Sequence, residues 1–300
     1  MTRRLRRSSL RVGSVLLAGF GLAIDRSALG ALALLVVAVV PLERRWPRHR
    51  QPWRRPGLLL DVGHALAGGL AGVALLLAAG TLALVSGAWV SGWTFRPLVG
   101  ALPSPVRAVV GFVLFDLVFY WVHRAQHAWS PLWRLHRIHH SSRYLDWVSA
   151  FRNHPLDGFV AGPPAVLLIV AGFPAEAAGA LLVLQLAVGV LLHANVRWRL
   201  RPLWTLVATP EFHHWHHEAR PGCGGTNLAA FLPVWDVVFG TYRMPAHERP
   251  QRYGVDDPTA TTLAGQWLEP FRQRPTSASV PATAPAAGAP CGIAPMGHDR

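Results

Sequence analysis

Histidine is the residue type whose number and spacing in this chain could do chemistry. Fifteen histidines occur in 300 residues, and eleven of them lie between His123 and His217. All but His154 fall into four sets, three of them with the three- or four-residue spacing of a helix: His123 and His127; His136, His139 and His140; His193; and His213, His214, His216 and His217. Residues three and four apart share a helix face, so each spaced set is expected to direct its imidazoles toward one point.

Several neutral imidazoles that converge are typical of a metal site, with ligand nitrogens about 2.0–2.2 Å from the ion. Eight or nine clustered histidines exceed the roughly four to six ligands of one ion, so the sequence predicts two metal ions. Imidazole suits iron, zinc, copper and nickel, which leaves the metal open. The sets contain no cysteine, which excludes iron–sulfur clusters and thiolate zinc, and the scarcity of carboxylates disfavours a glutamate-bridged di-iron bundle.

The elements that must position these histidines are expected to be membrane helices. Hydrophobic residues make up 51% of the chain and charged residues only 15%, against about 25% charged residues in a soluble domain. A helix needs about 20 apolar residues to cross a bilayer. Four spans and a membrane-associated helical hairpin are predicted, at residues 12–24, 27–42, 62–90 and 108–122, and at 158–192 for the hairpin. A signal peptide over residues 1–30 is the alternative for the first span.

The net charge of +14 is concentrated near the N-terminus, where twelve arginines face only Asp25 and Glu43 within residues 1–56. These arginines flank apolar stretches, which indicates the positive-inside arrangement of a membrane protein and not a nucleic-acid-binding domain. Residues 43–56 are then cytoplasmic, and the spans that follow return the histidines to the same side. A chain rich in alanine and glycine, with arginine and no lysine, indicates a bacterial high-GC genome and hence the plasma membrane.

The expected fold is an all-α polytopic membrane protein with about four transmembrane helices, a membrane-associated hairpin and a cytosolic, histidine-rich helical cap. Its expected parts are an N-terminal transmembrane region (1–104), a catalytic domain (105–245), a C-terminal extension (246–271) and a tail (272–300). The tail is rich in proline, alanine and serine without periodicity, which predicts disorder.

The order HxxxH, HxxHH and HxxHH resembles the fatty acid hydroxylase / sterol desaturase superfamily of membrane-bound histidine-box oxygenases. The surrounding segments resemble that family as well, over residues 116–124, 151–157, 209–210 and 227–241. The resemblance covers residues 105–245. The first spacing, HxxxH, makes the chain less similar to the acyl-CoA desaturases and the carotenoid-ring hydroxylases.

This resemblance implies a di-iron centre that uses O2 and external electrons to hydroxylate or desaturate a C–H bond of a lipid, such as a sterol or a fatty acyl chain. A separate ferredoxin, cytochrome or reductase would supply the electrons, because the chain has no recognisable nucleotide, haem or iron–sulfur motif. Carried over residue by residue, the implied ligands are His123, His127, His136, His139, His140, His193, His213, His216 and His217. His154 has no assigned role, and His214 is expected to face away.

Four further polar residues are expected to support the ligands: Asp116, Tyr120, Asn195 and Glu218. A carboxylate inside an apolar helix is costly and is usually functional or paired. Asp116 is therefore expected to accept the free N–H of a ligand histidine and so fix its tautomer. The alternative for Asp116 is a buried pair with an arginine. Glu218, directly after the last ligand, is expected to be a similar acceptor.

Two other classes of function fit part of the pattern. A zinc-dependent membrane hydrolase or isomerase would use the same imidazoles to activate water, without O2 or an electron donor. A transporter that relays protons through histidines would need them inside the spans, whereas most of them lie beyond the spans. Metal identity and oxygen dependence distinguish the zinc enzyme from the oxygenase.

Overall fold

The computed structural model describes residues 37–68, 78, 81, 95–160, 162–220 and 224–272 of the chain. Within these ranges the protein is helical and has no β-strand, only two isolated bridges. The elements are a helix over 37–45, α3 (Leu58–Gly63), a π-helical turn (His64–Gly68), α5 (Phe95–Ala101), α6 (Ser104–Ala128), α7 (Ser130–His140), a 3₁₀ turn (Ser149–Phe151), α8 (Pro155–Val160), α9 (Pro163–Ala171), α10 (Ala175–His193), a 3₁₀ turn (Arg201–Leu203), α11 (Pro210–His216), α12 (Val234–Phe239), α13 (Leu263–Leu268) and a 3₁₀ turn (Glu269–Phe271).

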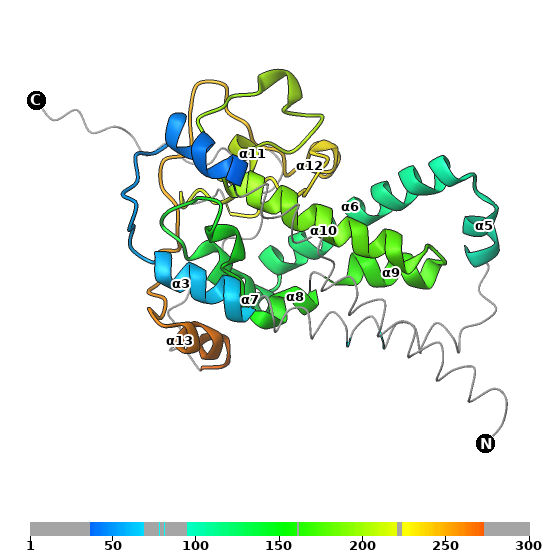
Figure 1. Ribbon diagram of the computed structural model, residues 1–300, viewed down its shortest axis with the longest axis horizontal. Coiled ribbons are helices and arrows are strands. Elements are labelled where there is room, and N and C mark those ends of the chain that lie inside the picture. Colours follow the sequence, from blue (N-terminus) through cyan, green and yellow to red (C-terminus); the bar gives the residue numbers. More distant parts are fainter. Residues whose placement is uncertain are drawn as a thin grey trace, which may run out of the picture.

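In the part of the chain that the structure describes, two helices, α6 and α10, are long and apolar enough to cross a membrane. Their 25 and 19 residues correspond to about 37 and 28 Å at about 1.5 Å per residue. Only 22% and 17% of their most apolar windows are buried in the protein, so most of that surface is free to face lipid. Figure 1 shows α6, α9 and α10 extending away from the other elements on one side of the molecule.

The hairpin expected at 158–192 is present, with one difference. Its second arm, α10, is a candidate span by itself, whereas a partly inserted pair was expected. Gly172 ends the first arm, α9, in the left-handed region (φ 103°), and a Cβ there would lie 2.8 Å from Cγ of Arg96. Glycine is therefore required at this turn. Both arms pack against α6 in a core that includes Phe115, Leu168 and Phe173.

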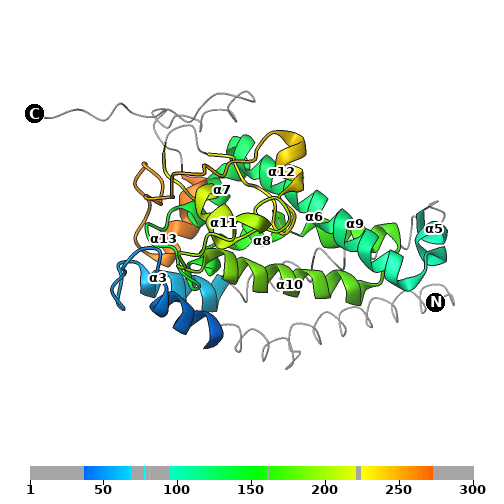
Figure 2. The ribbon, with the colours of Figure 1, turned by 90° about the horizontal axis from the view of Figure 1, so that it is seen from above.

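Apart from α5, which lies at the outer end of the long helices, the remaining elements gather at their other end, in a region that we call the cap (Figure 2). The helix α6 enters the cap at its C-terminal end, and Pro131 at the start of α7 turns the chain directly after it. The C-terminal end of α10 enters the same region, next to α11. The cap therefore receives the last turns of both candidate spans.

The count of four spans is not established by the structure. The predicted span 108–122 lies within α6. The stretch at 12–24, most of the stretches at 27–42 and 62–90, and nearly all of the tail at 272–300 lie outside the described residues; residues 37–42 are helical. A helical, membrane-associated architecture is what the described part of the chain supports.

Candidate metal centre

The cap brings nine of the clustered histidines together in two adjacent groups. Group A contains five histidines from α6, α7 and α11, and group B contains four from α7, α10 and the end of α11. Within each group the potential ligand nitrogens lie within 4.8 Å of one another. Group A is His123, His127, His136, His140 and His216, and group B is His139, His193, His213 and His217.

The groups do not correspond to the sequence sets. His123 and His127 meet in group A as expected, but the expectation of one point was wrong for the second set and for the last set, which divide between the groups. Successive helical residues advance by about 100°, so i and i+4 are about 40° apart while i+3 lies about 60° to the other side. In α7, His136 and His140 therefore join group A and His139 joins group B. The last set divides by the same rule: its i and i+4 histidines enter group B and its i+3 histidine enters group A.

Ring nitrogens in both groups face each other at short range. Nε2 of His193 lies 3.2 Å from Nε2 of His139 and 3.2 Å from Nε2 of His213. In group A, Nε2 of His123 lies 3.2 Å from Nε2 of His136. Two nitrogens about 2.1 Å from one ion, at ligand angles of about 90–110°, would be roughly 3.0–3.4 Å apart. The observed spacing is therefore that of ligands around a common ion.

The other ring nitrogen of several of these histidines fixes the tautomer. Nδ1 of His123 donates to the carbonyl of Leu228 at 2.7 Å, and Nδ1 of His193 donates to the carbonyl of Gly189 at 2.7 Å. In the same way, Nδ1 of His216 donates to the carbonyl of Thr226 at 2.9 Å. A neutral imidazole carries one N–H, so donation from Nδ1 leaves a bare lone pair on Nε2. Lone pairs facing each other repel unless a cation lies between them.

Protonation is not an effective substitute for that cation. Burial, followed by the proximity of other imidazoles, lowers the pKa of His139, His140 and His213 well below 6.5. The same causes lower the pKa of His216 and His217. These side chains are therefore neutral at physiological pH, which is the form that binds a metal.

Three ring nitrogens of group A are buried without a hydrogen-bond partner in the described part of the chain: Nε2 of His127, His140 and His216. A buried polar atom without a partner is costly, and such atoms call for an explanation such as an ion. With the facing Nε2 pairs, they show that the donor set fits two metal ions with imidazole ligands. The groups are close neighbours, because the rings of His140 and His217 stack with centroids 4.3 Å apart.

Asp157 orients a group A histidine, and the sequence analysis gave it no role. Its Oδ2 accepts from Nδ1 of His136 at 3.0 Å, while its Oδ1 accepts from Nε2 of Gln126 at 2.6 Å. Asp157 is buried. A carboxylate bonded to the far nitrogen of a ligand histidine is a recurring feature of metal sites. The available signal was its position in the segment 151–157, where a family resemblance had already been noted.

A buried ion network supports His139 in group B. The backbone carbonyl of Arg152 accepts from Nδ1 of His139 at 3.3 Å. The guanidinium of Arg152 pairs with Asp61, which is fully buried and also pairs with Arg55 at 2.6 Å. Arg55 in turn bonds both carboxylate oxygens of Asp146. The segment before the predicted span at 62–90 is thereby fixed to the metal centre.

Asp116 does not contact a histidine, which corrects the expectation for it. Its carboxylate accepts from the backbone N–H of Phe231 and Leu232, at 3.0 and 2.9 Å, and from the indole N–H of Trp235 at 3.0 Å. The arginine alternative is not the observed arrangement either. Asp116 instead holds the loop that precedes α12 against α6. That loop includes Leu228, whose carbonyl orients His123.

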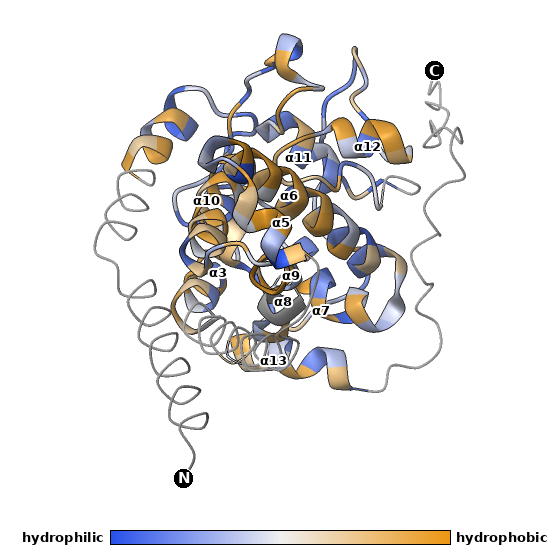
Figure 3. Ribbon diagram, turned by 90° about the vertical axis from the view of Figure 1, so that its right-hand side faces the viewer, coloured by the Kyte–Doolittle hydropathy of each residue, from blue (hydrophilic) through white to orange (hydrophobic). Residues whose placement is uncertain are grey.

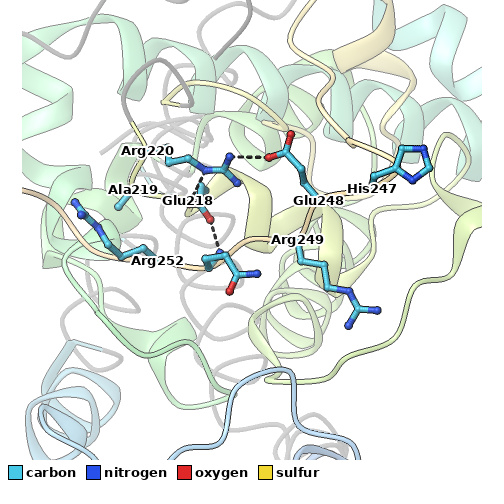
Figure 4. Close-up of a pocket in the computed structure, with 8 residues that line it drawn as sticks. Glu218, Ala219, Arg220, His247, Glu248, Arg249 and Arg252 are labelled. Carbon is cyan, nitrogen blue, oxygen red and sulfur yellow. Dashed lines mark hydrogen bonds and ion pairs between the residues drawn. The ribbon is translucent and has the colours of Figure 1, made fainter. Parts of the chain in front are cut away.

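The other three expected supporting residues also bond elsewhere. The hydroxyl of Tyr120 is bonded to Thr241 at 2.9 Å, and the side-chain amide of Asn195 donates to the carbonyl of His49 at 2.8 Å. Glu218 accepts from Arg220 at 3.0 Å and from the backbone N–H of Gln251 at 2.7 Å. Figure 4 shows Glu218 in a surface cleft with Arg220, Glu248 and Arg252. The expected role of Glu218 as an acceptor for a histidine is therefore not what the structure shows.

Two of the eleven histidines between His123 and His217 lie outside both groups. His214 is bonded through Nδ1 to the hydroxyl of Tyr253 at 2.8 Å and through Nε2 to the carbonyl of Ala194 at 3.1 Å. His154 is bonded through Nε2 to the carbonyl of Trp267 and through Nδ1 to the N–H of Leu156. With both nitrogens engaged, neither ring offers a free ligand atom. The expectation that His214 faces away is confirmed.

Comparison with known proteins agrees with this centre. The family model described as fatty acid hydroxylase matches residues 108–241, which contain all nine histidines. The ornithine lipid hydroxylase OlsE of Rhizobium tropici is 28% identical over 257 residues, covering 80% of this chain and 75% of the relative. No solved structure matches the chain.

Two groups of eukaryotic relatives match a smaller region. The human alkylglycerol monooxygenase is 30% identical over 161 residues, covering 53% of this chain and 35% of the relative. Methylsterol monooxygenase 1-3 of Arabidopsis thaliana is 26% identical over 178 residues, covering 55% of this chain and 59% of the relative. The chain thus spans about a third of the alkylglycerol monooxygenase and three quarters of the ornithine lipid hydroxylase. The relatives named here are oxidoreductases. The histidine boxes lie inside residues 108–241, the region of this chain that matches the fatty acid hydroxylase family model.

Proposed function

We propose that this chain is a membrane-embedded di-iron monooxygenase that hydroxylates a C–H bond of a lipid. The reaction consumes the lipid, O2, two electrons and two protons, and yields the hydroxylated lipid and water. The observation that carries the proposal is the pair of adjacent groups of buried, neutral histidines in which ring nitrogens face each other at 3.0–3.2 Å. The zinc hydrolase alternative is not favoured, because the named relatives are hydroxylases and monooxygenases.

In this proposal group A holds one iron and group B the other. Bound iron supplies the capacity to reduce and activate O2. The protein supplies orientation, since the carbonyls of Leu228, Gly189 and Thr226 and the carboxylate of Asp157 keep the Nε2 atoms deprotonated. Burial excludes water from the ligands. We assign the catalytic unit to 105–245, with 1–104 and 246–271 as its flanking parts.

The substrate class follows from what the relatives share. Their names specify an ornithine lipid, an alkylglycerol and a methylsterol, which are lipids with a polar end and an apolar body. The ornithine lipid hydroxylase matches over the largest part of this chain, so a polar membrane lipid of that kind is the first substrate to test. Hydroxylation is favoured over desaturation for the same reason. The electrons come from a separate ferredoxin, cytochrome or reductase.

We place the metal centre on the cytoplasmic side of a bacterial plasma membrane. The arginine-rich segment before α3 supports this, because its backbone pairs with the residues directly after α10. Trp46 accepts from the N–H of Arg197 at 2.9 Å, and Asn195 accepts from the N–H of Arg48 at 3.2 Å. Arginine-rich segments remain on the cytoplasmic side of a membrane. The histidine groups share that side with the segment.

The proposal is tested by the metal content of detergent-purified protein, with His139→Ala as the paired variant. We expect about two irons per chain in the wild type and a loss of iron in the variant. Stoichiometric zinc without iron, in cells supplied with ample iron, would support the hydrolase instead. Incubation with ornithine lipid, an alkylglycerol or a sterol, under O2 with a reduced carrier, then identifies the substrate by the mass of one added oxygen atom.

A further inference from the structure

The short helix α12 presents a wholly apolar face away from the protein. Val234, Val237 and Val238 are 40%, 50% and 63% exposed. Their spacing (i, i+3, i+4) places them on one side of the helix. The opposite side, with Trp235, Asp236 and Phe239, packs inward. Three exposed valines on one side of a six-residue helix form a poor surface for contact with water.

This helix is fixed to the second half of the candidate span α6. The indole of Trp235 donates to Asp116 at 3.0 Å. One turn further along α6, the ring of Tyr120 stacks on Phe239 with centroids 5.3 Å apart, and the ring of Trp121 contacts the same Phe239 at 4.8 Å. Figures 1 and 2 both show α12 alongside α6. The depth of α12 is therefore set by residues 116–121 of α6.

That depth lies in the half of the hydrocarbon layer that ends at Arg124, because residues 116–121 precede Arg124 by three to eight steps, or about 5–12 Å along the helix. Between Arg107 and Arg124, α6 contains one charged residue, Asp116, and these 17 steps cover about 25 Å of a hydrocarbon core about 30 Å thick. The guanidinium of Arg124 donates to the carbonyl of Phe239 at 3.2 Å, which places a charge at the C-terminal end of α12. The exposed indole of Trp121 (47%) is typical of an aromatic residue at the interface.

A second apolar segment adjoins α12. Leu206 and Val207 are 61% and 43% exposed, and the next residue, Ala208, donates its N–H to the carbonyl of Phe231 at 2.8 Å in the loop before α12. In Figure 3, which looks along the long helices from their outer ends, much of α12 is coloured as hydrophobic. We define the lipid-contact face as Leu206, Val207, Val234, Val237 and Val238.

We propose that the lipid-contact face of the cap is immersed in the bilayer, with acyl chains as its occupant. The inference rests on the membrane location in the proposed function but not on the catalysis. Interfacial segments carry a border of basic and aromatic residues. Here the border consists of Arg124 at one end of α12 and of Trp204, whose ring centre lies 5.4 and 5.6 Å from the guanidinium carbons of Arg199 and Arg201. The cap is then partly immersed in the bilayer on the side that carries the loop before α12, which includes Leu228.

Depth-dependent fluorescence quenching tests the proposal. Val238→Cys is made in the Cys223→Ser, Cys291→Ser background, labelled with the dye NBD, and reconstituted in phosphatidylcholine vesicles. Doxyl-labelled lipid carries the quencher near the headgroup or deep in the chain. Leu184→Cys on α10 is the control inside a candidate span, and Gln251→Cys in the surface cleft is the control away from lipid. Should Val238→Cys fail to fold, Leu206→Cys reports on the same face.

We expect the Val238 label to lose fluorescence to an extent comparable with Leu184 and far greater than Gln251, with the shallow quencher more effective than the deep one. Quenching no greater than that of Gln251 would overturn the proposal. Disulfide crosslinking between Val238→Cys chains without lipid quenching would also overturn it, because a second copy would then cover the face. The readout needs neither iron nor turnover, so failure of the proposed activity leaves it interpretable.

Discussion

Replacing Asp157 with asparagine is the most direct test of how the metal centre is built. The carboxylate of Asp157 accepts from His136 and from Gln126 at the same time, at 3.0 and 2.6 Å. Asparagine has the same shape but only one acceptor oxygen and no charge. One of the two donors therefore loses its partner, and the amide nitrogen of the new side chain faces a donor. The His136 ring is then free to rotate or to adopt the other tautomer.

The expected effect on metal binding is a loss of about 10- to 100-fold in iron affinity, as found when such orienting partners are removed. That range corresponds to about 1.4–2.7 kcal/mol at 25 °C. Loss of one hydrogen bond to a charged group costs the fold about 1.5–3 kcal/mol, which is of similar size. Stability and metal affinity must therefore be measured separately.

Iron affinity is measured by chelator competition on the detergent-purified protein, and stability by thermal unfolding of the metal-free form. Glu269→Gln is the matched control, because it removes a partly buried carboxylate that pairs with Arg137 at 2.5 Å and not with a histidine. We expect the control to lose stability and to keep its iron affinity. If Asp157→Asn binds iron as the wild type does, or if both variants lose iron equally, the orienting role of Asp157 is refuted.

Three further predictions follow from the contacts of the cap. His214→Gln should retain iron, because His214 is bonded to Tyr253 and Ala194 and not to either group. Its melting temperature should fall, since lost buried hydrogen bonds cost about 1–3 kcal/mol of stability. Loss of iron at unchanged stability would contradict this prediction. Asp116→Ala leaves three buried or partly buried donors without this acceptor, so thermal unfolding in detergent should show a destabilisation of about 1–3 kcal/mol. Wild-type stability would contradict this prediction. The metal-free protein should lose stability as pH falls from about 7.5 to about 5.5. In the folded protein the pKa of the clustered histidines lies below the unfolded value of 6.5. The unfolded chain therefore binds more protons than the folded protein in this pH range, and acid favours unfolding. A melting temperature that stays constant over that range would contradict this sign.

The helical spacing of the histidines could be recognised from the sequence because it is local. A periodicity of three and four residues needs no tertiary information, and α6, α7 and α11 present their histidines as that spacing predicts. The division of the sets in α7 and α11 between two groups was also present in the spacing, through the angle of about 100° per residue. It was missed because each set was treated as converging on one point.

The supporting residues could not be found in the same way, because their partners are distant in the sequence. Asp116 and Asp157 are both carboxylates near helical histidines, yet Asp116 bonds a loop 115 residues away while Asp157 bonds His136 across 21 residues. Asp61 reaches the site through Arg152, 91 residues away. Charge and burial cost alone identify such carboxylates as paired, but only the packing of the cap decides with which partner.

The same packing makes metal binding and folding of the cap interdependent. The histidines come from α6, α7, α10 and α11, and their orienting acceptors come from still other segments, such as the loop that Asp116 and Asp236 hold. Without a cation, facing lone pairs in a low-dielectric interior repel, and burial opposes protonation as a remedy. A metal ion removes that repulsion, and it can bind only when the cap is assembled. The free energy of metal binding therefore stabilises the folded cap. Variants that loosen the loop before α12 should therefore lose iron even when every histidine is intact.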